Sequence, residues 1–598
     1  MEDPMQENKW YILKEDKEER KLKINIYQIF TRLFGNKVQA NIPYGTIEEN
    51  GVGKFNDITE KALQEIKALG ISHVWYTGII EHALLTDYTA YDIPMDDADV
   101  VKGRAGSPYA IKDYYDVNPD LAVEVDKRMQ EFEYLLRRTH EQQLKVIIDF
   151  VPNHVARYYK SDVKPENIED LGEGDNKSIS FDPNNNFYYL VGHKFEVPKD
   201  YKPLGKLPFI HKDGFFNEDP AKATGNDLFT HQPCVNDWFE TVKLNYGKNY
   251  HFNTQHYSPI PATWLKMREI LMYWAGKKID GFRCDMAEMV PVEFWQWVIP
   301  EIKKYSPEII FIAEIYNPQQ YHNYIYQGKF DFLYDKVQLY DTLRNIITKK
   351  DTPDNLKNTW QFLRGINKHM LRFLENHDEQ RIASSQFCGD PFKALPAFAV
   401  SALLFTGPVM IYFGQEVGEE SGGDAGFSGD DGRTTIFDYW GVGQHQKWMN
   451  NAKFDGGGLR DDQVVLRDFY KAILNLKLKY PAFYEGDFLD LHTLNRNFNK
   501  EDYSTDIYSF IRFFEYEKIL VLTNFNHEGK AIKLSLPTEA LEVLKIAPDK
   551  KYMFKTLFSF GKQNTEMTQE IIFNRQQPFL LDIYLDKYEV HIIQILEV

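Results

Sequence analysis

The sequence predicts an α/β protein built on a closed (β/α)8 TIM barrel, with a subdomain inserted after strand three and a C-terminal antiparallel β-sandwich. Three observations predict it: eight short apolar runs recur along the chain, most are followed by a helical pattern, and the last part changes to alternation. A doubly wound open sheet is the alternative for the eight runs. At 598 residues the chain is too long for one hydrophobic core, so roughly two to four domains are expected.

The eight predicted barrel strands are apolar segments that end on polar residues. In chain order they are KINIYQIF (23–30), HVWYTGII (73–80), KVIIDFVP (145–152), IDGFRCD (279–285), IIFIAEI (309–315), FDFLYD (330–335), MLRFLEN (370–376) and VMIYFG (409–414). Helical patterns such as TEKALQEIKALG and MQEFEYLLRRTHEQQ separate them. The barrel is predicted to comprise residues 1–155 and 262–487.

Two segments do not show the alternation of strand and helix patterns that is expected for a barrel. Residues 156–261, between strand three and the next helix, are rich in Asn, Asp, Gly, Pro and Tyr, and predict a small folded subdomain rather than one loop. Residues 488–598 alternate apolar and polar positions, as in DIYSFIRFFEYEKILVLTNF, which predicts the antiparallel β-sandwich.

Composition restricts the classes of partner. Lysine and arginine number 70 against 88 acidic residues, a net charge of −18, which disfavours nucleic acid and an anionic membrane and leaves a neutral substrate. The apolar stretch 394–414 contains TGP, which indicates a buried helix turning into a buried strand rather than a membrane span. We make no prediction of oligomeric state.

Cysteine usage and the amino terminus indicate the compartment. Cys234, Cys284 and Cys388 are far apart and lack metal-like spacing, so we expect free thiols in a reducing environment rather than disulfides or a zinc site. The amino terminus carries acids where a signal peptide needs a basic region. We therefore expect a cytoplasmic protein, unless a signal has been removed.

Polar residues cluster where the predicted strands end, and in a barrel these ends meet at one face. The residues concerned are Asp149, Asn153 and His154 after strand three, Arg283 and Asp285 on strand four, Glu314 on strand five, and Glu375, Asn376, His377 and Asp378 on strand seven. Each motif alone is more often a salt bridge or a cap. Their joint placement favours an active site.

Two of these carboxylates are predicted to differ in acidity. Asp285 shares a strand face with Arg283, and an adjacent cation favours the ionised form, which suits a nucleophile. Glu314 follows the apolar IIFIA and lies near other carboxylates, so it should hold its proton more tightly, which suits a general acid. Such a pair is typical of glycoside hydrolysis.

At these residues the sequence closely resembles the α-amylase family of glycoside hydrolases (glycoside hydrolase family 13). The matching motifs are DFVPNH at 149–154, GFRCD at 281–285, AE at 313–314 and NHD at 376–378, in the family's order. The family's barrel, inserted subdomain and C-terminal β-domain also match the predicted organisation.

The resemblance implies a retaining enzyme that acts on α-1,4 links of starch- or glycogen-derived glucans or maltooligosaccharides. It implies that Asp285 is the nucleophile, Glu314 the acid/base and Asp378 the third carboxylate, which binds sugar hydroxyls. At the cleaved bond it implies further sugar contacts from Tyr109, which would stack, and from His154, Arg283 and His377. Asp149 and Asn153 are expected to organise the loop.

The sequence departs from the family pattern at three places. Glu288 and Met289 replace a lysine and a histidine common after the nucleophile, and Ala110 replaces a frequent aspartate. Lys243, in VKLNYG, stands where relatives often carry an aspartate that binds structural calcium. The chemistry requires no metal, and an ammonium disfavours calcium at that site. Lys243 is expected either to supply its own charge there or to be a solvated side chain.

Two alternative functions remain open. A transglycosidase or sugar isomerase of the same family would share the first half-reaction, and loops such as 419–435 would decide whether water is excluded. A noncatalytic sugar-binding or scaffold relative is the alternative from another class, which the three retained carboxylates disfavour.

Overall fold

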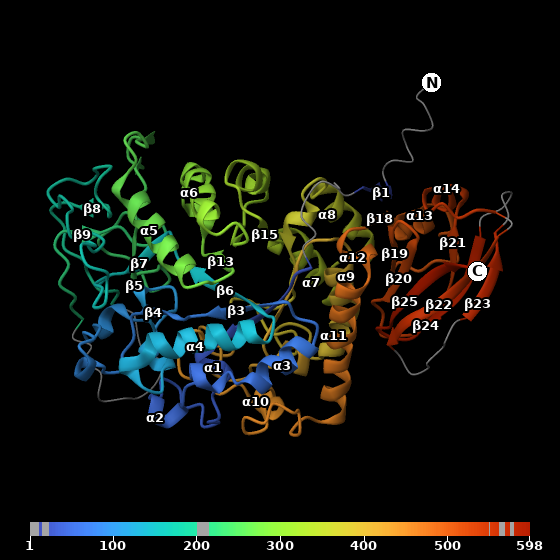
Figure 1. Ribbon diagram of the computed structural model, residues 1–598, viewed down its shortest axis with the longest axis horizontal. Helices are drawn as coiled ribbons and strands as arrows, with labels where there is room; N and C mark the ends of the chain where they lie inside the picture. Colours follow the sequence, from blue (N-terminus) through green and yellow to red (C-terminus); the bar gives the residue numbers. More distant parts are fainter. Residues whose placement is uncertain (1–10, 15–22, 200–213, 549, 561–567, 574–578) are drawn as a thin grey trace.

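The structure is a computed structural model that describes residues 11–14, 23–199, 214–548, 550–560, 568–573 and 579–598. Figure 1 shows the barrel in the middle of an elongated molecule. The segment that follows strand β6 lies at one end of it, and the C-terminal β-region lies at the other.

Eight parallel strands form the barrel, in the spatial order β16-β15-β14-β13-β6-β3-β2-β17. Their bounds are β2 (Asn25–Phe30), β3 (His73–Thr77), β6 (Lys145–Phe150), β13 (Gly281–Cys284), β14 (Ile310–Ala313), β15 (Phe332–Tyr334), β16 (Met370–Leu371) and β17 (Val409–Tyr412). A parallel bridge from Arg372 to Val409 joins the two ends of the sheet. This closure confirms the predicted barrel. The alternative prediction, a doubly wound open sheet, was wrong.

Alternation along each strand separates the barrel interior from the layer under the helices. In β6, Ile147 belongs to a cluster with Trp75, Ile312 and Met410, whereas its neighbour Ile148 belongs to the large cluster that includes the surrounding helices. Successive side chains on a strand point to opposite faces, so a strand buried on both faces has to be apolar throughout. This explains why the eight runs are nearly continuous.

Helices cover the outside of the barrel, as in Figure 1. The longer ones are α3 (Glu60–Ala68), α4 (Arg128–Glu141), α5 (Ala262–Gly276), α6 (Val292–Tyr305), α7 (Asp341–Ile347), α8 (Leu356–Phe362), α9 (Leu395–Leu403), α10 (Gly443–Met449) and α11 (Asp461–Lys479). Helix α13 (Leu491–Phe498) packs against the C-terminal β-region instead. The apolar stretch 394–414 forms α9 and β17, both fully buried, as predicted. In the described part of the chain, no helix has the length and apolarity that a membrane crossing needs.

The strands described between β6 and α5, outside residues 200–213, are short. They are β7 (His154–Ala156), β8 (Tyr189–Leu190), β9 (Ala221–Lys222), β10 (Thr241–Lys243), β11 (Lys248–Asn249) and β12 (Thr254–Gln255). β7 directly follows barrel strand β6, and it pairs antiparallel with β10. This pairing brings the later part of the segment back beside the point at which the chain leaves the barrel. His154 on β7 is thus registered with Lys243 on β10.

The C-terminal region is antiparallel and has two sheets. The larger has the order β1-β18-β19-β20-β25-β22-β23, and β21 pairs with β24. Their bounds are β18 (Asp487–Asp490), β19 (Ile507–Phe514), β20 (Glu517–Asn524), β21 (Lys530–Leu536), β22 (Lys551–Phe560), β23 (Thr568–Ile572), β24 (Phe579–Leu585) and β25 (Val590–Glu597). One apolar cluster contains residues of both sheets, which is the core of a sandwich.

One strand lies outside the predicted boundaries. β1 (Ile12–Leu13), within the segment assigned to the barrel, pairs with β18 at the edge of the C-terminal sheet. Two residues are too short to show alternation, and the pairing spans most of the chain, so the sequence pattern could not reveal it. The three cysteines are free thiols, as expected, and Cys284 is buried on β13.

Candidate active site

Strand register brings the predicted site residues together. Arg283 on β13 is registered with Asp149 on β6 and with Ile312 on β14. Registered residues of parallel neighbours share a face, and so do residues two apart on one strand. Asp149, Arg283, Asp285 and Glu314 therefore all point into the carboxyl end of the barrel, which is where a barrel places its site.

Arg283 is completely buried at the centre of this group. Its Nη1 donates to Asp285 Oδ1 at 2.8 Å and lies 3.4 Å from Asp149 Oδ1, and its Nη2 lies 2.8 Å from Glu314 Oε2. Its Nε donates to the Tyr334 hydroxyl at 3.1 Å. One guanidinium thus holds three carboxylates.

A cavity of about 390 Å³ opens beside these acids. Among the predicted residues, those that line it are Tyr109, His154, Asp285, Glu314 and Asp378. The side chains of Arg283 and His377 are fully buried. Arg283 pairs with the acids, and His377 contacts Asp378 and the Tyr109 hydroxyl. That both also hold the sugar stays a prediction.

Glu314 has the properties of a general acid. Burial raises its pKa, as do the charges of Asp285 and Asp378, while Arg283 opposes the shift, and the result is a pKa of about 7. Oε2 accepts a hydrogen bond from the Met286 backbone at 2.9 Å. A carboxyl that titrates near neutrality can both give and take a proton under physiological conditions.

The expectation for Asp285 was only partly correct. Arg283 does lower its pKa, but burial acts more strongly, and the pKa is raised from its ordinary value. The sequence could not show this because it reveals the neighbouring cation but not the loss of solvent. Arg283 therefore limits the rise in the pKa of Asp285 that burial causes.

Asp378 differs from the other two acids. Burial acts to raise its pKa, but the nearby His377 and Arg283 more than offset this, and the pKa is lowered. The Oδ2 atom lies 3.0 Å from Nε2 of His377, and 32% of the side chain is exposed. The Gln28 amide lies 2.8 Å from the other ring nitrogen of His377. Asp378 is thus an ionised acceptor at the cavity.

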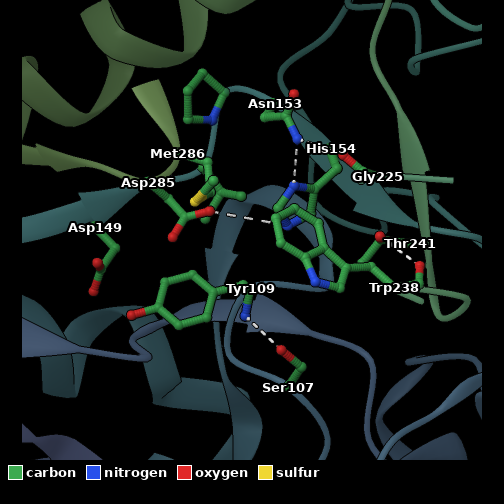
Figure 2. Close-up of polar contacts among 12 residues, drawn as sticks. Ser107, Tyr109, Asp149, Asn153, His154, Gly225, Trp238, Thr241, Asp285 and Met286 are labelled. Carbon is green, nitrogen blue, oxygen red and sulfur yellow. Dashed lines mark hydrogen bonds and ion pairs between the residues drawn. The ribbon is translucent and has the colours of Figure 1, made fainter. Parts of the chain in front are cut away.

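Tyr109 and His154 lie on either side of the nucleophile candidate. Figure 2 shows the Asp285 carboxylate pointing toward His154, with Trp238 beside that ring. Nε2 of His154 lies 4.0 Å from Asp285 Oδ2, and the Asn153 amide donates to its Nδ1 at 3.0 Å, so Nε2 carries the proton. Burial lowers the pKa of His154 to about 4, so this histidine is a neutral donor.

Lys243 occupies the position at which relatives often bind calcium. Its side chain is 2% exposed, and its ammonium lies 2.6 Å from Asp227 Oδ1. It also donates to Asn153 Oδ1 and to the Met289 carbonyl, the latter at 3.0 Å. The interpretation as a solvated side chain was wrong, because the ammonium bonds to Asn153 and pairs with Asp227. That its charge replaces a calcium ion stays a prediction. Asn153 organises the loop, as expected.

Three other carboxylates have the spacing of a metal site. Among the described residues, Glu81, Asp113 and Asp162 bring one oxygen each within 4.8 Å of the others. Asp162 is paired with Arg128 at 3.1 Å, and Asp113 accepts from the Ser161 hydroxyl at 2.6 Å. None of the three catalytic candidates belongs to this group.

Several cavity residues were not identified from the sequence. They are Lys102, Ser107, Trp238, Glu240, Thr241, Met286, Tyr316, Phe427, Ile436 and Phe437. Tyr316 could have been found, because it lies two residues after Glu314 and its hydroxyl reaches that carboxylate. Trp238 and Phe427 come from segments without barrel periodicity, where no pattern marks the residues that turn inward.

Comparisons with known proteins agree with this geometry. Residues 28–425 match the family model described as "Alpha amylase, catalytic domain". Alpha-amylase 3 of Dictyoglomus thermophilum is 22% identical over 544 residues, which are 87% of this chain and 88% of that protein. A cyclomaltodextrin glucanotransferase of a Bacillus species is 23% identical over 423 residues, 67% of this chain and 50% of that protein. The fold also matches the crystal structure of an alpha-amylase from Geobacillus thermoleovorans complexed with acarbose, with a TM-score of 0.60, 17% identity, and coverage of 97% and 99% of the two chains.

Proposed function

Because the chain belongs to the α-amylase family, we propose that it is a retaining glycosidase that hydrolyses α-1,4-glucosidic bonds of starch- or glycogen-derived glucans and maltooligosaccharides. The observation that carries this proposal is the pair formed by Asp285 and Glu314. Both line one cavity, both are held by Arg283, and the pKa of Glu314 is about 7.

The reaction proceeds in two steps. Glu314 protonates the glycosidic oxygen while Asp285 attacks the anomeric carbon, which breaks the bond to the leaving sugar and forms a glycosyl enzyme. Glu314, now a carboxylate, takes a proton from water, and the resulting hydroxide displaces Asp285 from the anomeric carbon. Both steps need Asp285 and Glu314 close together, and the shared guanidinium supports this.

The surrounding residues bind the sugar. Asp378 is ionised and partly exposed, so it can accept hydrogen bonds from hydroxyls of the ring at the cleaved bond. His154 donates from Nε2 into the same space, and the ring of Tyr109 supplies a flat face for stacking. No step requires a metal.

The test of the two roles is to trap the glycosyl enzyme. A Glu314→Gln variant treated with maltotriosyl fluoride should accumulate a covalent adduct, because fluoride leaves without protonation while the second step lacks its base. Intact-protein mass spectrometry should show the added maltotriosyl mass. The Asp285→Asn variant is the matched control and should show none; an adduct there would mean that another residue is the nucleophile. Absence of an adduct in both variants would favour a noncatalytic relative.

Transglycosylation is the second candidate, and one observation favours it. Phe427, from the loop 419–435, lines the cavity together with Phe437 and Tyr316. Such an apolar wall beside the acid/base can exclude water and leave a sugar hydroxyl as the acceptor. Products from maltoheptaose decide between the two: shorter sugars alone indicate hydrolysis, and longer oligosaccharides indicate transfer.

A further inference from the structure

Glu288 clamps the loop that follows the acid/base candidate. It lies in the turn η7 (Ala287–Met289), three residues after Asp285. Its Oε1 accepts a hydrogen bond from the Tyr316 backbone at 3.1 Å, and its Oε2 accepts one from the Asn317 backbone at 3.0 Å. Charge-assisted bonds of this kind are stronger than neutral ones. The two oxygens therefore fix two successive peptide units.

Tyr316 links this loop to the Glu314 carboxylate. Its hydroxyl donates to Glu314 Oε1 at 2.6 Å, while the Met286 backbone donates to Oε2 at 2.9 Å. The turn after β13 and the loop after β14 are thus joined in both directions. One connection runs from Met286 to Glu314, and the other runs from Glu288 through Tyr316 to the same carboxylate.

The contacts of Glu288 leave little room for a role in binding sugar. It stands where the family often has a lysine, but it does not line the cavity, and both its oxygens already accept backbone bonds. Its backbone carbonyl accepts from the Tyr324 hydroxyl at 3.1 Å, which also holds the turn. In place of a lysine, this chain therefore has a carboxylate that holds the loop after β14 through two backbone hydrogen bonds.

We propose that Glu288 and Tyr316 are positioning residues of the acid/base: Glu288 holds the loop, and the Tyr316 hydroxyl orients the Glu314 carboxylate toward the bond to be cleaved. This rests on the proposed function, in which Glu314 transfers the proton. A hydrogen bond to a carboxylate favours its charged form, so Tyr316 opposes the effect of burial on Glu314. The charged and titratable groups that face Glu314 include Arg283, Asp149, Asp285, Asp378, Tyr316 and Tyr334.

The Tyr316→Phe variant removes the hydroxyl and keeps the ring. Without this donor the pKa of Glu314 should rise, so the alkaline limb of the kcat/KM profile on maltooligosaccharides should move upward by about one pH unit. Tyr305→Phe is the matched control, since Tyr305 is 58% exposed at the end of α6. Its profile should equal that of the wild type. An unchanged limb in Tyr316→Phe would overturn the role of the hydroxyl.

The Glu288→Gln variant tests the clamp. The amide oxygen can accept one of the two backbone bonds but not both, so the loop should loosen and kcat on maltotriose should fall about tenfold with little change in KM. Hydrolysis of maltosyl fluoride, whose leaving group needs no proton, should be less affected in its first step, measured as the rate of fluoride release in single turnover. Glu293→Gln, in the first turn of α6, is the control.

The outcomes separate this inference from the proposed function. Equal losses on maltotriose and on the fluoride would show that Glu288 does not act through Glu314, and would overturn the inference alone. A wild-type enzyme without activity on either substrate would overturn the proposed function and this inference together. Thermal melting of each variant shows whether an activity loss reflects unfolding instead of misplacement: a loss that tracks a large fall in Tm would also count against positioning.

Discussion

Arg283 donates a 2.8 Å hydrogen bond from Nη1 to Oδ1 of Asp285, and its other terminal nitrogen lies 2.8 Å from Glu314. One buried cation therefore holds both carboxylates that the proposed reaction needs. Burial raises the pKa of both Asp285 and Glu314, and the charge of Arg283 lowers both. Without Arg283, the two pKa values would therefore rise further.

Replacing Arg283 by leucine should damage catalysis by changing the acidity of Asp285. Without the cation the pKa of Asp285 rises further, so the acidic limb of the kcat/KM profile should move to higher pH. The limb is measured on maltooligosaccharides between about pH 4 and 8. An Arg283→Lys variant, which keeps a charge but cannot hold two carboxylates at once, should show a smaller shift. An acidic limb that stays in place in Arg283→Leu would rule out this electrostatic role.

The wild-type enzyme should lose activity as Glu314 deprotonates. Its pKa of about 7 predicts an alkaline limb of kcat/KM near neutrality, because the first step requires the protonated form. Activity should therefore be highest between the acidic limb set by Asp285 and this pH, and should fall above it. In Glu314→Gln the limb should vanish, since the amide does not titrate. A limb that persists in this variant would belong to another group.

Asp378→Asn should lose activity while remaining folded. The side chain is 32% exposed, so its replacement removes few packing contacts, but an amide has lost the acceptor charge that binds sugar hydroxyls. We expect kcat/KM to fall about a hundredfold and Tm to change by less than about 2 °C. The comparison is made by kinetics and thermal melting on the same preparation. A fall in Tm as severe as the fall in activity would identify a structural carboxylate.

Lys243→Met should destabilise the protein, and calcium removal should not. The methionine leaves Asn153 and Asp227 without their cation, which we expect to cost about 3 kcal/mol in the free energy of unfolding. Lys248→Met, on the half-buried strand β11, is the control and should cost much less. EDTA treatment of the wild type should leave Tm and activity unchanged. A large fall in Tm or in activity that added calcium restores would show that a metal does stabilise the structure.

The barrel and the candidate catalytic carboxylates could be predicted from the sequence because both depend on short-range patterns. A strand buried on both faces must be apolar, and a charged residue at its end is visible as an interruption. Asp285 follows Arg283 by two positions, so their common face was already determined. The order of the strands then places Asp149, Asp285 and Glu314 at one end of the barrel.

Other features depended on contacts between distant segments. The pairing of β1 with β18, the burial of Lys243 against Asp227, and the approach of Trp238 and Phe427 to the cavity have no local pattern. The same holds for the bonds from Glu288 to the loop after β14. A long-range contact is decided by packing, which a one-dimensional pattern does not record.

The sequence by itself determined the fold class, the strand ends and the candidate catalytic carboxylates, because periodicity, short motifs and residue chemistry are local properties. Only the tertiary structure decided their protonation and their surroundings. Asp285 illustrates the difference: its neighbour Arg283 is visible in the sequence, yet its pKa is raised because burial removes water from the carboxylate. Desolvation arises from every segment that closes over a site, and those segments meet only in the folded chain.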